Sequence, residues 1–181
     1  MGEIKSTLEL AMERTKKVTI SEKEKEEIKQ KEVLQKATSL FHRYREGHLS
    51  LNEILKQIEK MEKKTAATVK ELLLSQWIDA LSLGDGDERI LKGIESLKGR
   101  NLDELKQKFH YLLSQYQVVK GTIKEEVRVQ FTKDLRRDGI YGSAVEPKLE
   151  GGELWKKENE KLGQIYKAKL EEIKEQLRTY K

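Results

Sequence analysis

The amino-acid sequence predicts an all-α protein, and three observations support this fold class. The chain of 181 residues has a single Pro, where average usage would give about nine, and Pro disrupts helix interiors. Strong helix formers such as Glu, Lys and Leu make up more than half of it. Apolar residues recur at helical spacing, and β-branched runs bounded by turn residues are absent. We expect an elongated antiparallel helical bundle with long, coiled-coil-like helices.

The first helix is expected over residues 3–17, where apolar side chains repeat every three or four positions. A second helix should begin after Ser21, because Ser21 and Glu24 form a capping-box pattern. Its first turns carry a single apolar side chain, so we expect them to project into solvent. Gly47 should end this helix, because glycine readily adopts the left-handed conformation of a helix stop.

A second capping-box pattern, Ser50 with Glu53, predicts the start of a third helix. The helical pattern either continues through residues 63–67 or pauses at Thr65 or Thr68, and the sequence leaves both alternatives open.

The most apolar segment of the chain follows, at residues 69–83. Its apolar side chains surround roughly 240° of the helix axis, against about 100° for an ordinary surface helix. Such a segment needs neighbours on more than one side, so it is either the centre of the bundle or a subunit interface. The candidate interface residues are Leu74, Trp77, Ile78 and Leu81.

Three further helices are expected in the C-terminal half. A short helix over residues 87–97 should end at Gly99, and a helix of about 36 residues should start at a capping box formed by Asn101 and Glu104. A final helix should cover residues 153–179. The first half of the long helix alternates three- and four-residue apolar spacings, as in a coiled coil: Leu102, Leu105, Phe109, Leu112, Tyr116, Val119 and Ile123.

The segment 138–152 is the one extended stretch without a helical pattern, and it holds the only Pro. Because half of it is apolar, part of it should pack, and Ile140 and Tyr141 either plug the bundle end or contact a partner. Its glycine-rich turn, near Arg136 and Arg137, is also a weak candidate for anion binding. The candidate interaction residues here are Arg136, Arg137, Ile140 and Tyr141.

We expect a single helical domain over residues 1–181, with a candidate subdivision into 1–99 and 100–181. The long helix would span about 54 Å, whereas a compact globule of this length is about 40 Å across. The excess length and the wide apolar arc together predict a homodimer.

The sequence offers no catalytic, cofactor or metal site. It has no Cys, and its three His lack the spacing of a helical metal pair. The acids Asp79, Asp85, Asp87 and Glu88 do not follow the order of a calcium loop, and turn formation and helix capping explain Asp85 and Asp87 without a metal.

The formal net charge of +5 lies wholly in residues 91–181, because residues 1–90 carry equal numbers of acidic and basic side chains. Acids interleave with the bases, which weakens the field that a nucleic acid would meet. Nucleic-acid binding by the basic half is therefore the alternative function rather than the leading one. No apolar run is long enough to span a membrane, and the absence of Cys fits the cytoplasm.

Two short segments, Met1–Leu10 and Gly139–Pro147, resemble parts of small uncharacterised bacterial helical proteins. The resemblance implies a bacterial cytoplasmic source, and it carries no activity and no site residues. From the sequence we expect a non-enzymatic helical protein that self-associates and presents a helix face or the 138–152 loop to an unidentified protein partner.

Overall fold

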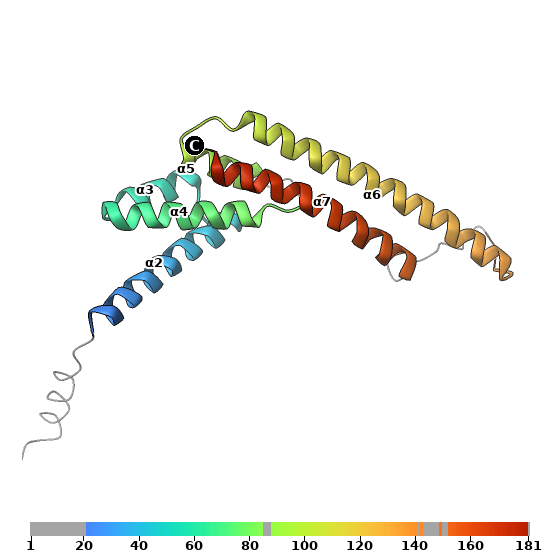
Figure 1. Ribbon diagram of the computed structural model, residues 1–181, viewed down its shortest axis with the longest axis horizontal. Helices are drawn as coiled ribbons and strands as arrows, with labels where there is room; N and C mark the ends of the chain where they lie inside the picture. Colours follow the sequence, from blue (N-terminus) through green and yellow to red (C-terminus); the bar gives the residue numbers. More distant parts are fainter. Residues whose placement is uncertain (1–20, 85–87, 141, 143–148, 150–151, 181) are drawn as a thin grey trace, which may run out of the picture. The chain divides into compact units, whose positions relative to one another are not determined.

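The computed structural model describes residues 21–84, 88–140, 142, 149 and 152–180, and these residues are all-α. They form six helices and no strand, which confirms the predicted fold class (Figure 1). The helices are α2 (Glu22–Arg45), α3 (Leu51–Glu59), α4 (Lys63–Ala80), α5 (Glu88–Lys98), α6 (Asp103–Arg137) and α7 (Glu153–Thr179). The helix expected over residues 3–17 lies outside the described residues.

The chain divides into two compact units, residues 1–72 and 73–181. The division falls inside α4, whereas the candidate boundary taken from the sequence is at residue 99. Each unit has its own set of buried side chains. The described core of the first unit comprises Ala37, Leu40, Phe41, Tyr44, Leu49, Ile54, Ile58 and Val69.

Both capping boxes of the first unit form as the sequence predicts. The Ser21 side chain accepts from the backbone N–H of Glu24, whose carboxylate accepts from the Ser21 N–H at 2.7 Å. Ser50 and Glu53 repeat this reciprocal arrangement at the start of α3. Each box satisfies two N–H groups that a helix start otherwise leaves without partners.

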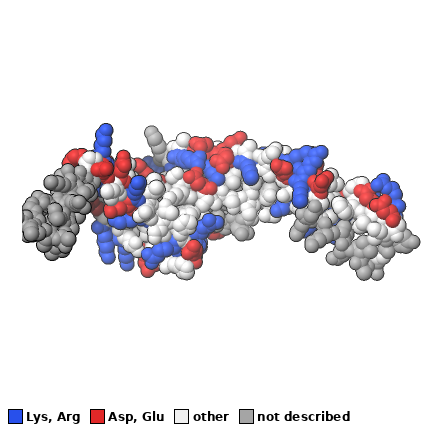
Figure 2. Space-filling view, turned by 90° about the horizontal axis from the view of Figure 1, so that it is seen from below, with Lys and Arg blue, Asp and Glu red and all other residues white. Residues whose placement is uncertain are grey.

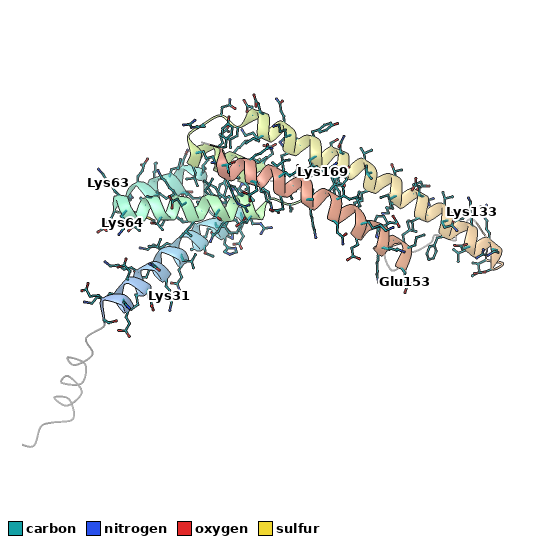
Figure 3. The ribbon with its side chains drawn as sticks, viewed as in Figure 1. Lys31, Lys63, Lys64, Lys133, Glu153 and Lys169 are labelled. Carbon is teal, nitrogen blue, oxygen red and sulfur yellow. The ribbon has the colours of Figure 1, made fainter. Side chains whose placement is uncertain are left out.

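Helix α2 has an exposed beginning and a buried end. Residues 21–32 are all exposed, including Lys31, which is labelled in Figure 3. The buried residues start at Ala37 and run to Tyr44. Gly47 has a φ of 84° directly after the helix, as expected for a glycine stop.

The interruption between α3 and α4 comes earlier than either position considered from the sequence. Helix α3 ends at Glu59 and α4 begins at Lys63, so Thr65 and Thr68 lie inside α4. The break contains good helix formers and neither Gly nor Pro, so local propensity does not explain it.

In the second unit, α6 and α7 lie side by side and run in opposite directions (Figure 1). The rings of Tyr116 and Tyr166 are in contact, with centroids 5.3 Å apart. Further along α6, Phe131 lies against Gly152 at the start of α7. Positions later in α6 therefore lie beside positions earlier in α7, so the two helices form an antiparallel hairpin.

The start of α6 differs from the prediction. Leu102 occupies the cap position without a side-chain capping bond, so the box expected between Asn101 and Glu104 is wrong. Asn101 instead accepts from the Asp103 N–H at 2.7 Å. The N–H of Leu102 is bound by Glu95, which comes from α5.

Candidate interaction surfaces

The apolar segment of α4 is mostly buried by the chain itself. Trp77, Ile78 and Leu81 are at most 2% exposed, and Leu74 is half-buried. Of the two alternatives for this segment, its burial within a single chain matches the centre of a bundle. These three residues present no free surface for a partner.

Trp77 packs directly against α5. A Cβ added at Gly93 would lie 2.7 Å from Cζ3 of the indole, closer than real Cβ atoms approach other atoms. The missing side chain of Gly93 therefore lets the α5 backbone reach the tryptophan. Ile90, Leu91 and Ile94 are buried around this contact.

The end of α4 is tied to the end of α7 by two basic side chains. Lys174 donates to the backbone carbonyl of Asp79 at 3.2 Å, and Arg178 forms an ion pair with the Asp79 carboxylate. The last carbonyls of a helix lack partners within it and carry partial negative charge, so cations are favourable there. Lys174 is only 7% exposed. Its charge is also paired within α7, by the Glu171 carboxylate at 3.0 Å.

The start of α6 receives a carboxylate from α5. Glu95 accepts from the Leu102 N–H at 3.1 Å and from Nζ of Lys106 at 2.5 Å. Both bonds lower the pKa of Glu95, and the bond from Lys106 has the larger effect, so the carboxylate stays charged. The bond to Glu95 in turn raises the pKa of Lys106. A negative charge at a helix N-terminus is favourable, so the pair joins α5 to α6.

The charged and His side chains singled out in the sequence have structural contacts. His110 lies 2.9 Å from a Glu88 carboxylate oxygen, and His48 lies 3.5 Å from Glu46. Asp79 is paired with Arg178, whereas Asp85 and Asp87 lie outside the described residues. In the part of the chain that the structure describes, no three metal-ligating side chains come together.

The loop residues proposed for partner contact lie at the C-terminal end of α6. Arg136 and Arg137 are exposed, and Arg137 pairs with Asp134 one turn earlier at 3.3 Å. Ile140 is 49% exposed, so it does not plug a bundle end. Tyr141 lies outside the described residues. Leu149 is the buried residue that the structure describes within this segment.

An exposed surface of low charge runs along α6, opposite the face that packs. We call it the outer stripe. Its members are Gln115, which is half-buried, and the exposed residues Tyr111, Val118, Thr122, Glu125 and Val129. At 100° per residue they fall within about 80° of arc, and the buried side chains of α6 centre about 150° away. Tyr111 and Val118 are each 66% exposed and Val129 is 45% exposed.

Two polar side chains of the outer stripe form hydrogen bonds within α6 itself. Gln115 donates to the hydroxyl of Tyr111 at 2.6 Å, and Thr122 donates to the backbone carbonyl of Val118 at 3.2 Å. The side chains are therefore held on the helix surface. What the stripe offers to a partner is the apolar area of Tyr111, Val118 and Val129 beside these bonded polar groups.

The outer stripe was not identified from the sequence, although a signal for it is present. Residues 109–119 contain no Asp, Glu, Lys or Arg, in a chain that is 38% charged. The inner apolar seam accounts for Phe109, Leu112 and Tyr116 but not for Tyr111 or Val118. A second three- and four-residue spacing on the opposite side of the same helix would have revealed them.

Charges on the rest of the described surface are mixed. In the view of Figure 2, Lys and Arg side chains lie beside Asp and Glu side chains rather than in one broad patch. On α7, Nζ of Lys169, a residue that is labelled in Figure 3, lies 5.0 Å from the centroid of the Tyr166 ring. Such contacts stabilise helix surfaces and attract polyanions weakly.

Comparison of the chain with protein-family models, with curated proteins and with solved structures finds no match. Among the described residues, no helix combines the length and the apolar character needed to cross a membrane.

Proposed function

We propose that this chain is a non-enzymatic helical protein of the cytoplasm whose function is protein binding, including association with a second copy of itself. The outer stripe of α6 is the observation that carries the proposal. Apolar side chains such as Tyr111 and Val118 are costly to leave in water when they form a continuous surface, and contact with another helix removes that cost.

The placement of the shifted titratable groups also supports a structural role. The pKa of Glu24 and that of Glu53 are lowered by bonds to the serines that they cap. The pKa of Glu95 is lowered by its contacts to Lys106 and Leu102. Burial lowers the pKa of Lys98, which donates to the backbone carbonyl of Tyr180 at 2.7 Å. Each of these groups stabilises a helix end or joins two helices.

Sedimentation equilibrium of the full chain over a concentration series tests the proposal. We expect a reversible shift from the 21.1 kDa monomer to twice that mass. A constant monomer mass at every concentration would reject self-association. Gel shift with a DNA duplex at low salt provides a second measurement, and tight, salt-sensitive retardation would favour the nucleic-acid alternative instead.

A further inference from the structure

We infer that the outer stripe pairs with the outer stripe of a second copy of this chain, with the two α6 helices antiparallel. This inference rests on the proposed self-association and specifies its geometry. The two-fold axis passes midway between Val118 and Thr122, so that Val118 of each copy meets Thr122 of the other. Tyr111 then meets Val129 of the second copy, which places the two largest apolar contacts symmetrically on either side of the axis.

The same spacing extends beyond the outer stripe toward both ends of α6. Continuing it by steps of three and four residues adds Lys108 and Glu104 on one side and Thr132 and Arg136 on the other. Lys108, Glu104 and Arg136 are exposed. The extended stripe thus carries an acid near the start of the helix and a base near its end.

Antiparallel pairing makes these charges complementary. Glu104 of each copy lies opposite Arg136 of the other, which gives two symmetric ion pairs at the ends of the contact. In the same register, Gln115 lies opposite Glu125 of the second copy, and an amide can donate to a carboxylate. The pairs are thus acid with base, donor with acceptor, apolar with apolar and, for Lys108 and Thr132, polar with polar. At the centre Val118 meets Thr122, whose hydroxyl is already bound to the backbone carbonyl of Val118 in its own helix.

Other alignments lose the pairs between Glu104 and Arg136. A parallel, in-register pair would place Glu104 against Glu104 and Arg136 against Arg136, and like charges at an interface are unfavourable. Sliding the antiparallel pair by one heptad in either direction moves Glu104 and Arg136 away from each other. The register centred between Val118 and Thr122 therefore keeps both ends paired along about 48 Å of helix.

The absence of Cys makes the geometry directly measurable. Gln107 is exposed at the edge of the stripe and Ser114 is exposed just outside it, so each can be replaced singly by Cys and spin-labelled in the full chain. With 1.5 Å per residue and helix axes about 10 Å apart, we expect interlabel distances of about 20 Å for Ser114→Cys and about 40 Å for Gln107→Cys. Parallel helices in register would give about 10 Å at both sites and overturn the inference.

Substitutions test the contacts themselves, with the dimer dissociation constant as the readout. Val118→Lys should raise it at least about tenfold, because it places two charges at the centre of the apolar contact. Ile165→Lys is the control, since Ile165 is 57% exposed on α7, outside the stripe. Both positions are on the surface, and circular dichroism should show unchanged helix content.

Charge reversal tests the register. Glu104→Arg or Arg136→Glu alone should weaken the dimer, and the two together should restore it, because the swapped charges face each other again. If the wild-type chain dimerises while Val118→Lys and the single reversals bind as tightly, this pairing is wrong and the proposed self-association stands. If the wild-type chain remains a monomer, both fail.

Discussion

The backbone of α5 reaches the indole of Trp77 because residue 93 is a glycine. A Cβ at that position would lie 2.7 to 2.9 Å from three carbons of the ring. Trp77 is fully buried and Gly93 is buried in the middle of α5, so neither side has free space. A glycine costs a helix about 1 kcal/mol relative to alanine, and here close packing against the largest side chain offsets that cost.

Replacing Gly93 by Ala should therefore destabilise the protein, although alanine is the better helix former. We expect a loss of about 1–3 kcal/mol in the free energy of unfolding, because the ring or the helix must shift. Denaturant unfolding followed by tryptophan fluorescence measures it. Gly163→Ala in α7 is the matched control, since a Cβ there meets nothing within 4 Å and should stabilise by up to about 1 kcal/mol. Equal effects of the two substitutions would contradict the packing argument.

The two serine capping boxes should differ in their effect on stability although both have the same reciprocal pair of backbone bonds. Ser50 begins α3, which is nine residues long and buries Ile54 and Ile58. Ser50→Ala should lower the global stability by about 1 kcal/mol. Ser21 begins an exposed segment with no buried side chain before Ala37, so Ser21→Ala should fray the helix locally.

Denaturant unfolding and amide hydrogen exchange separate the two effects. We expect Ser21→Ala to speed exchange in residues 22–32 while leaving the unfolding midpoint unchanged. A global loss for Ser21→Ala as large as that for Ser50→Ala would show that the start of α2 is packed.

Signals within one helix made much of the fold predictable. The caps at Ser21 and Ser50, and the glycine after α2, concern groups within a few residues of one another, and the structure has them as expected. The final helix, α7, also occupies the predicted residues, 153–179. Where a helix end is satisfied by its own side chains, composition and spacing contain the information.

Contacts between distant residues were not predictable in this way. The N–H of Leu102 is bound by Glu95 of the preceding helix, so the local box at Asn101 does not form. The function of Gly93 depends on Trp77, which lies in another helix. The apolar arc of α4 is compatible both with the centre of a bundle and with a subunit interface, because it predicts burial without identifying the neighbour that provides it.

The contact between Glu95 and Lys106 should make stability depend on pH in the acid range. The pKa of Glu95 is lowered from its ordinary 4.5 in the folded protein, so the contact stabilises fully above about pH 4.5 and is lost as the pH falls through the folded value. Glu95→Gln should cost about 1 kcal/mol at pH 7, and this difference from the wild type should shrink toward zero in strong acid. Urea unfolding of the wild type and of Glu95→Gln, at pH 7 and at a series of lower pH values, measures how this difference in the free energy of unfolding changes.

Glu158→Gln is the control for Glu95. Glu158 pairs at 2.7 Å with Lys161, whose side chain is 57% exposed against 18% for that of Lys106, and exposed pairs contribute little. We expect a change below about 0.5 kcal/mol at either pH. A pH-independent loss for Glu95→Gln would contradict this electrostatic role, because glutamine has nearly the same shape as glutamic acid.

Lys174 should contribute to stability through the end of α4. Its Nζ donates to the Asp79 carbonyl, and its aliphatic stem is buried. Lys174→Met keeps most of the apolar stem and removes the donor, so we expect a loss of about 1 kcal/mol in the free energy of unfolding. Lys157→Met, a substitution at an exposed position of the same helix, should change this free energy by less than about 0.5 kcal/mol.

Hydrogen exchange provides a second measurement. Exchange should become faster in the last turn of α4 for Lys174→Met alone, because the loss of the amine frees the carbonyl end of that helix. Equal stability of the two variants would show that Lys174 contributes only through its stem.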